Sequence, residues 1–426
     1  MTVLYWVNDD GDNAYSSVNN WSTGDGVSGG DGPPGASDDI WFTSKVIDDC
    51  TVDTSVDVTS INVYYYSGII DFNDNAVTAG NIGLGGNILM GNGLWNCTGT
   101  SFSLENVDTL DKENSVLLLN GSNLDLNCGS GYILNDIYIS SGASVTINST
   151  ADRLVAQNLI VSGNFDTFPY SSLPQTNSVH ISIGNNLSLL GRTKDLRNTL
   201  MSFGGNLLIS GISSFSHASS IFTCTGIVNQ TVNIQNNIDD LIINKSSGSV
   251  TINNFSTGNT IEVNNGTLNI NNNDIYLLEN FTVDGGLINS AGLSGITLTV
   301  LGDFYVSGLS LSGNAPWNLT VGGAGSVYNS LVKNSNASLG NIIYAYNTID
   351  TGNNTNWLFF QDSERDIFNI NATGIMIRHG SSIISVDGIN VYQTNTDNIF
   401  SKPTITNLRW KYKNRFDDNN YYSSTG

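Results

Sequence analysis

Short apolar–polar–apolar triplets recur along the chain and form its dominant pattern. Each triplet alternates with period two, which is typical of a β-strand with one buried face. Nine of them are Ile137/Ile139, Leu159/Val161, Leu187/Leu189, Leu207/Ile209, Leu241/Ile243, Ile261/Val263, Phe281/Val283, Leu298/Val300 and Leu319/Val321. Their first positions lie 17 to 34 residues apart, about 23 on average. A period of this length indicates a solenoid.

Second strands follow several triplets after a short polar turn, as at residues 145–147 and 250–252. A repeat with two or three short strands and no helix corresponds to one coil of a β-solenoid. We therefore predict an all-β fold, a right-handed parallel β-helix of about 23 residues per coil. Inward apolar side chains would stack from coil to coil into a continuous core.

The composition agrees with this fold, because the chain is rich in Asn and Gly and poor in charge. It has 60 Asn and 45 Gly among 426 residues, and 12 % of its residues are charged, against about 25 % in an ordinary globular domain. Both residue types disfavour helices, which argues against helical bundles and α/β dinucleotide folds. Asn tolerates the left-handed conformation of tight corners, and stacked Asn side chains can bond to each other between coils.

The two ends of the chain differ from the repeats. Residues 1–45 contain Trp6, Trp21 and Trp41 and a Gly-rich stretch, and we predict a loop-rich cap with aromatic plugs. Residues 46–360 would form the parallel β-helix. Residues 361–426 would form a small β-rich C-terminal domain or attachment segment, with strands at 374–378, 383–386, 389–392 and 407–412.

The charge distribution excludes some partners. The net charge of −22 belongs to residues 1–360, and the last 66 residues are neutral. Such a balance argues against nucleic-acid binding, which needs cations to displace counterions. Apolar runs are too short to cross a bilayer, so no membrane insertion is expected. The N-terminus lacks the basic and apolar regions of a secretory signal, so no export is expected either.

Two stretches resemble β-helix proteins encoded by tailed bacteriophages. The first combines Asn20-Trp21-Ser22, GDGVSGGDGPPGASDDIWF at 24–42 and CTVDTSVDVTSINV at 50–63. Those proteins often open with W-S, a Gly-rich loop, an S-x-D-D-aromatic strand and a C-T-hydrophobic strand. The second, at 334–360, is similar to their last rungs, where an alanine-containing strand precedes D-x-GNN-x-x-W. Here those positions are Ala345, Asp350, Gly352, Asn353, Asn354 and Trp357.

The resemblance covers residues 1–360 in kind and matches motifs at the two ends, while residues 361–426 match no family. It implies a virion structural protein, a tail fibre or tailspike-like surface protein for host-surface contact that assembles in the host cytoplasm. Other virion proteins would be its partners, host surface polysaccharide is a further candidate, and a homo-oligomer, by the usual tailspike state a trimer, is expected. Three alternatives stay open: a head decoration or head fibre protein, a polysaccharide-degrading tailspike, and an exported bacterial adhesin.

Candidate chemistry is sparse, and the balance favours a non-enzymatic protein without a cofactor or metal. The best carboxylate set is Asp239 and Asp240, with Glu262 about one coil later; the competing interpretation is a solvated turn. The residues Asp9, Asp10, Asp12 and Asn13, and Asp71, Asn73, Asp74 and Asn75, offer oxygens for calcium, but neither group has the pattern of an EF-hand loop. His180, His217 and His379 are too far apart to indicate zinc.

Three further features complete the candidates. The segment Arg409, Trp410, Lys411, Tyr412, Lys413, Arg415 and Phe416 combines cations with aromatic residues. It predicts a docking patch for a partner, or an amphipathic edge strand. Tyr64, Tyr65 and Tyr66 form a candidate sugar-stacking surface, with Tyr64 and Tyr66 on one strand face. Cys50, Cys97, Cys128 and Cys224 lack C-x-x-C spacing; disulfides stay open, and buried free thiols are favoured.

Overall fold

A computed structural model describes residues 1–129, 131–147, 153–167, 178–255, 257–271, 273–289 and 293–360, together with six strands beyond residue 366. Residues 1–276 and 277–426 form two compact units. Parallel strands stack turn upon turn as a β-solenoid, with about 14 turns that follow one another about 21 residues apart. The only helix with assigned bounds in the described part of the chain is a short 3-10 turn, η1 (Val18–Asn20). The prediction of an all-β parallel solenoid is confirmed.

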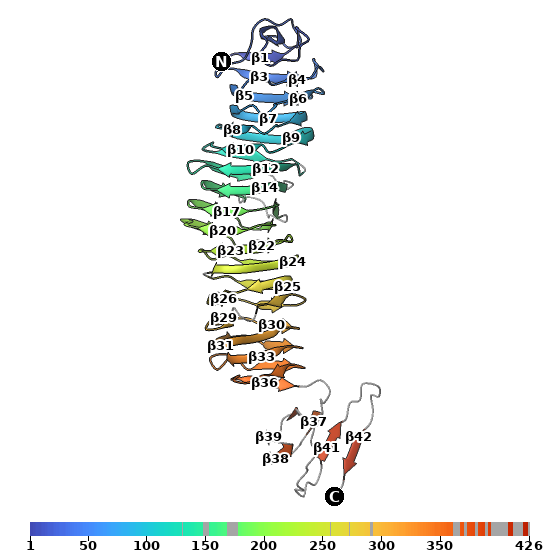
Figure 1. Ribbon diagram of the computed structural model, residues 1–426, viewed down its shortest axis with the longest axis vertical. Helices are drawn as coiled ribbons and strands as arrows, with labels where there is room; N and C mark the ends of the chain where they lie inside the picture. Colours follow the sequence, from blue (N-terminus) through green and yellow to red (C-terminus); the bar gives the residue numbers. More distant parts are fainter. Residues whose placement is uncertain are drawn as a thin grey trace. The chain divides into compact units, whose positions relative to one another are not determined.

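In residues 1–276, successive turns place their strands in layers (Figure 1), and the parallel pairings define three faces. The first face runs through β1 (Val3–Trp6), β3 (Asp39–Thr43), β5 (Val56–Tyr64), β7 (Val77–Leu89), β9 (Ser101–Asp111), β11 (Leu124–Asn127), β13 (Ser144–Ile147), β15 (Asn164–Asp166), β18 (Thr193–Asp195) and β21 (Ser214–Ser216). β2 (Trp21–Ser22) pairs antiparallel with β1.

The second face uses parts of β5 and β7 and then β8 (Leu94–Cys97), β10 (Val116–Leu119), β12 (Ile133–Ile139), β14 (Arg153–Val161), β17 (Leu187–Leu190), β20 (Leu207–Ser210), β23 (Gln230–Ile234), β24 (Asp240–Phe255) and β25 (Thr260–Asn269). The third face adds β4 (Cys50–Thr51), β6 (Ile69–Asp71), β16 (Val179–Ile183), β19 (Thr199–Phe203) and β22 (Ile221–Cys224) to parts of the longer strands. β26 (Ile275–Leu277) stands at the unit boundary.

Residues 277–426 continue the pattern with their own turns. One face contains β27 (Phe281–Val283), β30 (Phe304–Ser307), β32 (Gly325–Tyr328), β34 (Ile343–Tyr346) and β36 (Trp357–Phe360). Another contains β29 (Thr297–Val300), β31 (Ser310–Val321), β33 (Leu331–Asn336) and β35 (Ile349–Asp350). A two-residue strand, β28 (Leu287–Ile288), completes this part.

The core is a set of apolar columns that run from turn to turn. The column Ile137–Leu159–Leu187–Leu207–Val232–Ile252 joins six strands of the second face in register, and every member is buried. Outward positions between them carry polar or half-buried residues. This is the period-two alternation that the triplets predicted.

The predicted spacing of about 23 residues is longer than the observed 21. The first four triplets do share one column, since Ile137, Leu159, Leu187 and Leu207 are in register. The fifth, at Leu241, belongs to a different face, in register with Phe222. The 34-residue gap between Leu207 and Leu241 therefore separates positions on two different faces. The 28-residue gap between Leu159 and Leu187 contains residues 168–177, which lie outside the described residues.

The N-terminal residues close their end of the stack with aromatic rings. Trp6 and Trp21 are buried with ring centroids 5.3 Å apart, and Phe42 lies 5.7 Å from Trp21. The indole Nε1 of Trp21 donates to the carbonyl of Tyr15 at 2.7 Å. Trp41 differs from the other two, because it faces outward on β3, beside Tyr5. Two of the three predicted tryptophan plugs therefore lie in the core.

Six short strands are described in the C-terminal region. They are β37 (Ile367–Asn369), β38 (Thr373–His379), β39 (Ser382–Asp387), β40 (Val391–Tyr392), β41 (Leu408–Lys411) and β42 (Tyr421–Ser424). All of their pairings are antiparallel, in the orders β40–β37–β41–β42 and β38–β39. The four predicted strands thus correspond to β38, β39, β40 and β41.

Candidate functional site

Carboxylates line up on the outer side of the first face. Asp125 on β11 and Asp166 on β15 both pair with Thr146, and Asp166 pairs in register with Asp195 on β18. Neighbouring strands lie about 4.8 Å apart. Because their neighbours Phe165 and Lys194 are buried, Asp166 and Asp195 both point outward, side by side on consecutive turns.

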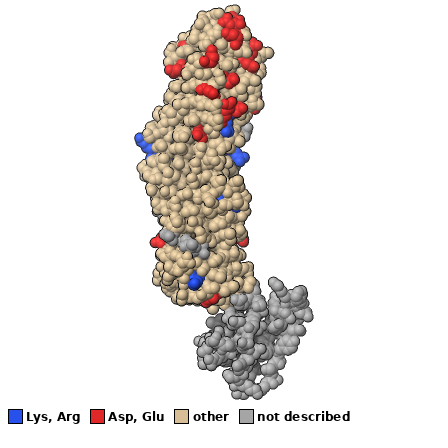
Figure 2. Space-filling model, viewed as in Figure 1, with Lys and Arg blue, Asp and Glu red and all other residues tan. Residues whose placement is uncertain are grey.

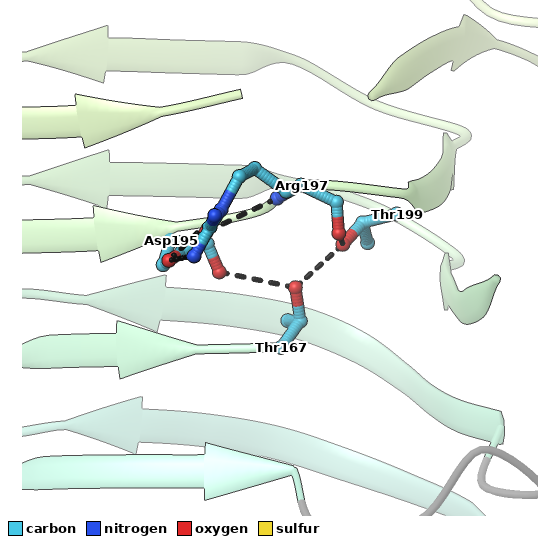
Figure 3. A network of polar contacts seen from close by, with 4 residues as sticks. All are labelled: Thr167, Asp195, Arg197 and Thr199. Atoms are coloured by element: carbon cyan, nitrogen blue, oxygen red, sulfur yellow. Dashed lines mark hydrogen bonds and ion pairs between the residues drawn. The ribbon is translucent and has the colours of Figure 1, made fainter. Parts of the chain in front are cut away.

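An arginine binds the carboxylate of Asp195. The guanidinium of Arg197 donates to Asp195 through Nη2 at 2.6 Å and through Nε at 2.9 Å (Figure 3). The hydrogen bond with Asp195 raises the pKa of Arg197, and the charge of Asp166 adds to the effect. One cation therefore offsets the repulsion between two acidic side chains on adjacent turns.

Two threonines tie this corner to the turns beside it. The hydroxyl of Thr167 donates to the backbone carbonyl of Asp195 at 3.1 Å and lies 2.5 Å from the hydroxyl of Thr199 (Figure 3). Thr199 in turn donates to the carbonyl of Arg197 at 3.4 Å. Both threonines are buried. Their hydrogen bonds fix the backbone of Asp195 and Arg197, the two residues of the ion pair.

A buried amine lies directly inside the acidic corner. Lys194 is fully buried, and its Nζ donates to the carbonyls of Gly163, Leu190 and Gly191 at 2.5, 3.1 and 2.8 Å. Burial lowers the pKa of Lys194 to about 8, and the charge of Arg192 adds to this. The amine satisfies three carbonyls at a corner where the chain turns, which is a structural use of a charged group.

The arrangement has one chemical capability beyond structure. Retaining glycosidases place two carboxyl groups about 5–5.5 Å apart, which is close to the spacing of neighbouring strands. The register places Asp166 and Asp195 opposite each other on neighbouring strands, with their side chains on the same outer face.

The sequence pattern missed this pair because the two acids are 29 residues apart. Residues 168–177 lengthen that turn, so a search at the 20- to 23-residue period does not align them. A glycine precedes each short strand, but Asp166 follows Gly163 by three residues and Asp195 follows Gly191 by four. Aligning the glycines therefore leaves the two acids one position apart.

The predicted set Asp239, Asp240 and Glu262 does not share one register position. Asp240 pairs with Thr260, whereas Glu262 pairs with Ile242, two positions further along the strand. Asp239 is buried and accepts hydrogen bonds from the amide of Ser219 and the side chain of Asn259. The interpretation as a solvated turn is therefore wrong for Asp239, which serves as a buried link between turns.

The two predicted calcium clusters use their oxygens to tie loops together. Asp12 accepts from the amide of Ala14 at 3.0 Å and from Asn20 at 2.6 Å, and the bond with Ala14 is the main cause of its lowered pKa. Asp74 accepts from the amide and side chain of Asn92 at 2.7 and 2.6 Å. Within the described residues, no group of three or more His, Cys, Asp and Glu is arranged to hold a metal ion.

The tyrosine run divides differently from the prediction. Tyr64 and Tyr65 are exposed, and Tyr66 is buried with its hydroxyl donating to the carbonyl of Asp48. Tyr64 and Tyr66 therefore do not share a face. The reason is the left-handed backbone of Tyr65, whose φ is +54°, because a left-handed residue turns the chain and breaks the strand alternation.

The predicted docking patch is described only in part. Arg409, Trp410 and Lys411 belong to β41, while Tyr412, Lys413, Arg415 and Phe416 lie outside the described residues. β41 pairs with β37 on one side and with β42 on the other. It is thus a central strand of its sheet, and the interpretation as an edge strand is wrong. The docking role of these residues stays a prediction.

All four cysteines are buried thiols and none forms a disulfide, so the favoured interpretation is confirmed. Burial raises the pKa of Cys97 to about 11 and that of Cys50 well above its ordinary value. These thiols behave as small core side chains.

Comparison with known proteins identifies no relative, since no family model, curated protein or solved structure matches the chain. Among the described residues, no helix has the length and apolar character needed to cross a membrane.

Proposed function

We propose that this chain is a non-enzymatic structural protein of a bacteriophage virion, a β-helical tail fibre or tailspike-like protein that contacts the host surface. One observation carries the proposal: outward polar side chains are bonded from turn to turn. Asn120 donates to Asn96 at 2.6 Å, and Asn353 donates to Asn334 at 2.9 Å. Side chains committed in this way stiffen the stack, which suits a protein that presents a surface.

The resemblance of residues 20–63 and 334–360 to phage β-helix proteins supports the virion location. It supports a head decoration or head fibre protein equally, and an exported bacterial adhesin is the third placement. In each placement we expect the partners to be other proteins of the particle or cell surface, and we expect the chain to associate with further copies of itself. The residues Arg409, Trp410 and Lys411 on β41 remain the candidate attachment point.

Imaging decides between these placements. Purified virions are labelled with an antibody against this protein and examined by electron microscopy. Label on the tail supports the proposal, label on the head replaces it with the decoration role, and label confined to host cells or medium overturns the virion location. Virions from a phage that lacks the gene provide the control for antibody specificity.

A polysaccharide-cleaving tailspike is the second candidate, and the register of Asp166 with Asp195 favours it. The test incubates the purified protein with host capsular polysaccharide and measures new reducing ends. Asp166→Asn and Asp195→Asn would abolish cleavage, while Asp125→Asn, two turns away on the same face, would not. Absence of reducing ends with the wild-type protein removes this candidate and leaves the structural proposal in place.

A further inference from the structure

One exposed aromatic residue occupies a backbone conformation that the chain elsewhere gives to other residue types. Tyr65 has a φ of +54° and is 73 % exposed. The other described non-glycine residues with positive φ are Asn, Asp, Glu, Arg or Ser. A bulky side chain is strained in this region, whereas Asn or Gly adopts it readily. An exposed ring gains little packing in return, so strain here is typical of a functional position.

A second exposed ring stands against the first. Tyr64 is 52 % exposed, and its ring centroid lies 4.3 Å from that of Tyr65 in an edge-on arrangement. A hydrogen bond with Tyr65 raises the pKa of the Tyr64 hydroxyl. The segment is anchored on both sides, since Tyr64 pairs with Thr43 on β3 and Tyr66 is buried. The backbone that carries the two rings is therefore fixed on both sides.

Two buried glycines of β7 lie against the backbone that carries the rings. Gly85 and Gly86 lie so close to the previous turn that an added Cβ would be 2.8 Å from the carbonyl of Val63 and 2.3 Å from that of Tyr66. No other residue type fits there. Gly85 pairs with Asn106 on β9, whose side chain is exposed. The exposed amide of Asn106 therefore lies two turns from the aromatic pair, and Gly85 and Gly86 put no side chain on the turn between them.

We propose that Tyr64 and Tyr65, with Asn106, bind a neutral glycan. Aromatic rings pack against the apolar C–H faces of sugars, and an amide supplies hydrogen bonds to hydroxyls. The charge selects the ligand class. Residues 1–111 contain 16 acidic residues and one basic residue, Lys45, so a polysaccharide with carboxylate or sulfate groups is repelled.

This inference deepens the proposed function and rests on it for the source of the glycan, which would be the host surface. The binding chemistry itself stands without the virion. Failure of the two proposals is therefore distinguishable: a protein absent from virions can still bind a neutral glycan, and a protein present on virions can fail to bind one.

The test applies purified full-length protein to immobilised neutral, uronic-acid and sulfated glycans. We expect binding to neutral glycans, and Tyr65→Asn should weaken it at least about tenfold while the melting temperature stays equal or rises, because Asn accepts a positive φ. Tyr64→Ser should also weaken binding. Tyr276→Asn is the matched control, since Tyr276 is 41 % exposed at another place, and it should leave binding unchanged.

Opposite effects of Tyr65→Asn on affinity and stability separate a binding residue from a structural one. No binding to any neutral glycan, preference for anionic glycans, or unchanged affinity in Tyr65→Asn would each overturn the proposal. A loss of affinity accompanied by a lower melting temperature would also overturn it, because Tyr65 would then be supporting the fold. If no glycan binds and the same substitutions weaken a contact with a protein, the rings belong to a protein-binding surface instead.

Discussion

At the scale of single residues, the solenoid depends on Asn at its corners. Ten of the fifteen described non-glycine residues with positive φ are Asn. The left-handed conformation costs most residues about 1–2 kcal/mol, but Asn reaches it readily and adds a side-chain amide that bonds to the neighbouring turn. Asn334 shows both uses, with a φ of +57° and an amide that donates to the carbonyl of Gly313 at 2.8 Å.

Two substitutions at Asn334 separate these contributions. Asn334→Gly removes the side-chain bonds to Gly313 and Asn353 but keeps the freedom to adopt a positive φ. Asn334→Ala loses both. We expect Asn334→Ala to be less stable than Asn334→Gly by about 1 kcal/mol, and both to be less stable than the wild type, in urea unfolding. Equal stability of the two variants would show that backbone conformation contributes nothing at this corner.

The buried thiols make stability depend on alkaline pH. Cys97 lies with its sulfur 3.3 Å from the carbonyl of Gly80 and 3.4 Å from that of Ser101, and burial raises its pKa to about 11. The unfolded thiol ionises near pH 9, so the contribution is complete below that pH and is lost between about pH 9 and 11, by about 2–3 kcal/mol.

The measurement is the unfolding free energy of the wild type minus that of Cys97→Ala across this pH range. Other groups cancel in the difference, which should fall as the pH rises. A difference that is the same at pH 8 and pH 11 would contradict the assignment. The constant cost of the missing sulfur is read from the values below pH 8, where the folded and unfolded thiols are both protonated.

At the scale of strands, register brings like side chains together into columns. Tyr328, Tyr346 and Phe360 are in register on β32, β34 and β36, and their rings stack at centroid distances of 4.9 and 5.2 Å. Both ring pairs are within 17° of parallel. Parallel strands in register thus produce an aromatic ladder in which each ring covers the next.

Removing the middle ring should loosen the last turns. Tyr346→Leu keeps apolar area but breaks two ring contacts, each worth about 0.5–1.5 kcal/mol. We expect amide hydrogen exchange in β34 and β36 to accelerate accordingly. Tyr344→Leu is the control, because Tyr344 has one longer ring contact, 6.3 Å from Phe360. Equal acceleration in both variants would show that the ladder adds nothing beyond apolar area.

The strands also show what could be read from the sequence. The period-two triplets and the Asn and Gly corners predicted the parallel solenoid, because every turn must solve the same packing and turning problem. The register could not be read, because a turn can lengthen without disturbing its neighbours. Because residues 168–177 stand between them, Asp166 and Asp195 are not one regular period apart in the sequence, although they are in register. The left-handed backbone of Tyr65 breaks the strand alternation, so the sequence pattern did not show which tyrosine enters the core.

At the scale of the whole chain, charge is distributed unevenly. Residues 1–136 contain 19 acidic and 2 basic residues, whereas residues 178–255 contain 3 acidic and 4 basic. Figure 2 shows the acidic side chains gathered over the N-terminal turns. Strands in register about 4.8 Å apart bring these charges close together, so the N-terminal turns carry a self-repulsion that the middle turns lack.

Salt should therefore stabilise one part of the chain and not the other. The screening length falls from about 30 Å at 0.01 M to less than 10 Å above 0.1 M, which weakens repulsion between acids on neighbouring turns. We expect hydrogen exchange in β3, β5 and β7 to slow when NaCl is raised from about 0.01 to about 0.5 M, with little change in β19, β20 and β23. Because each turn contacts only its neighbours, such a local response is possible. The double substitution Asp57→Asn and Asp108→Asn should reduce the salt effect in β3, β5 and β7. An equal response to salt in these strands and in β19, β20 and β23 would show that salt acts on the solenoid in general rather than on its acidic turns.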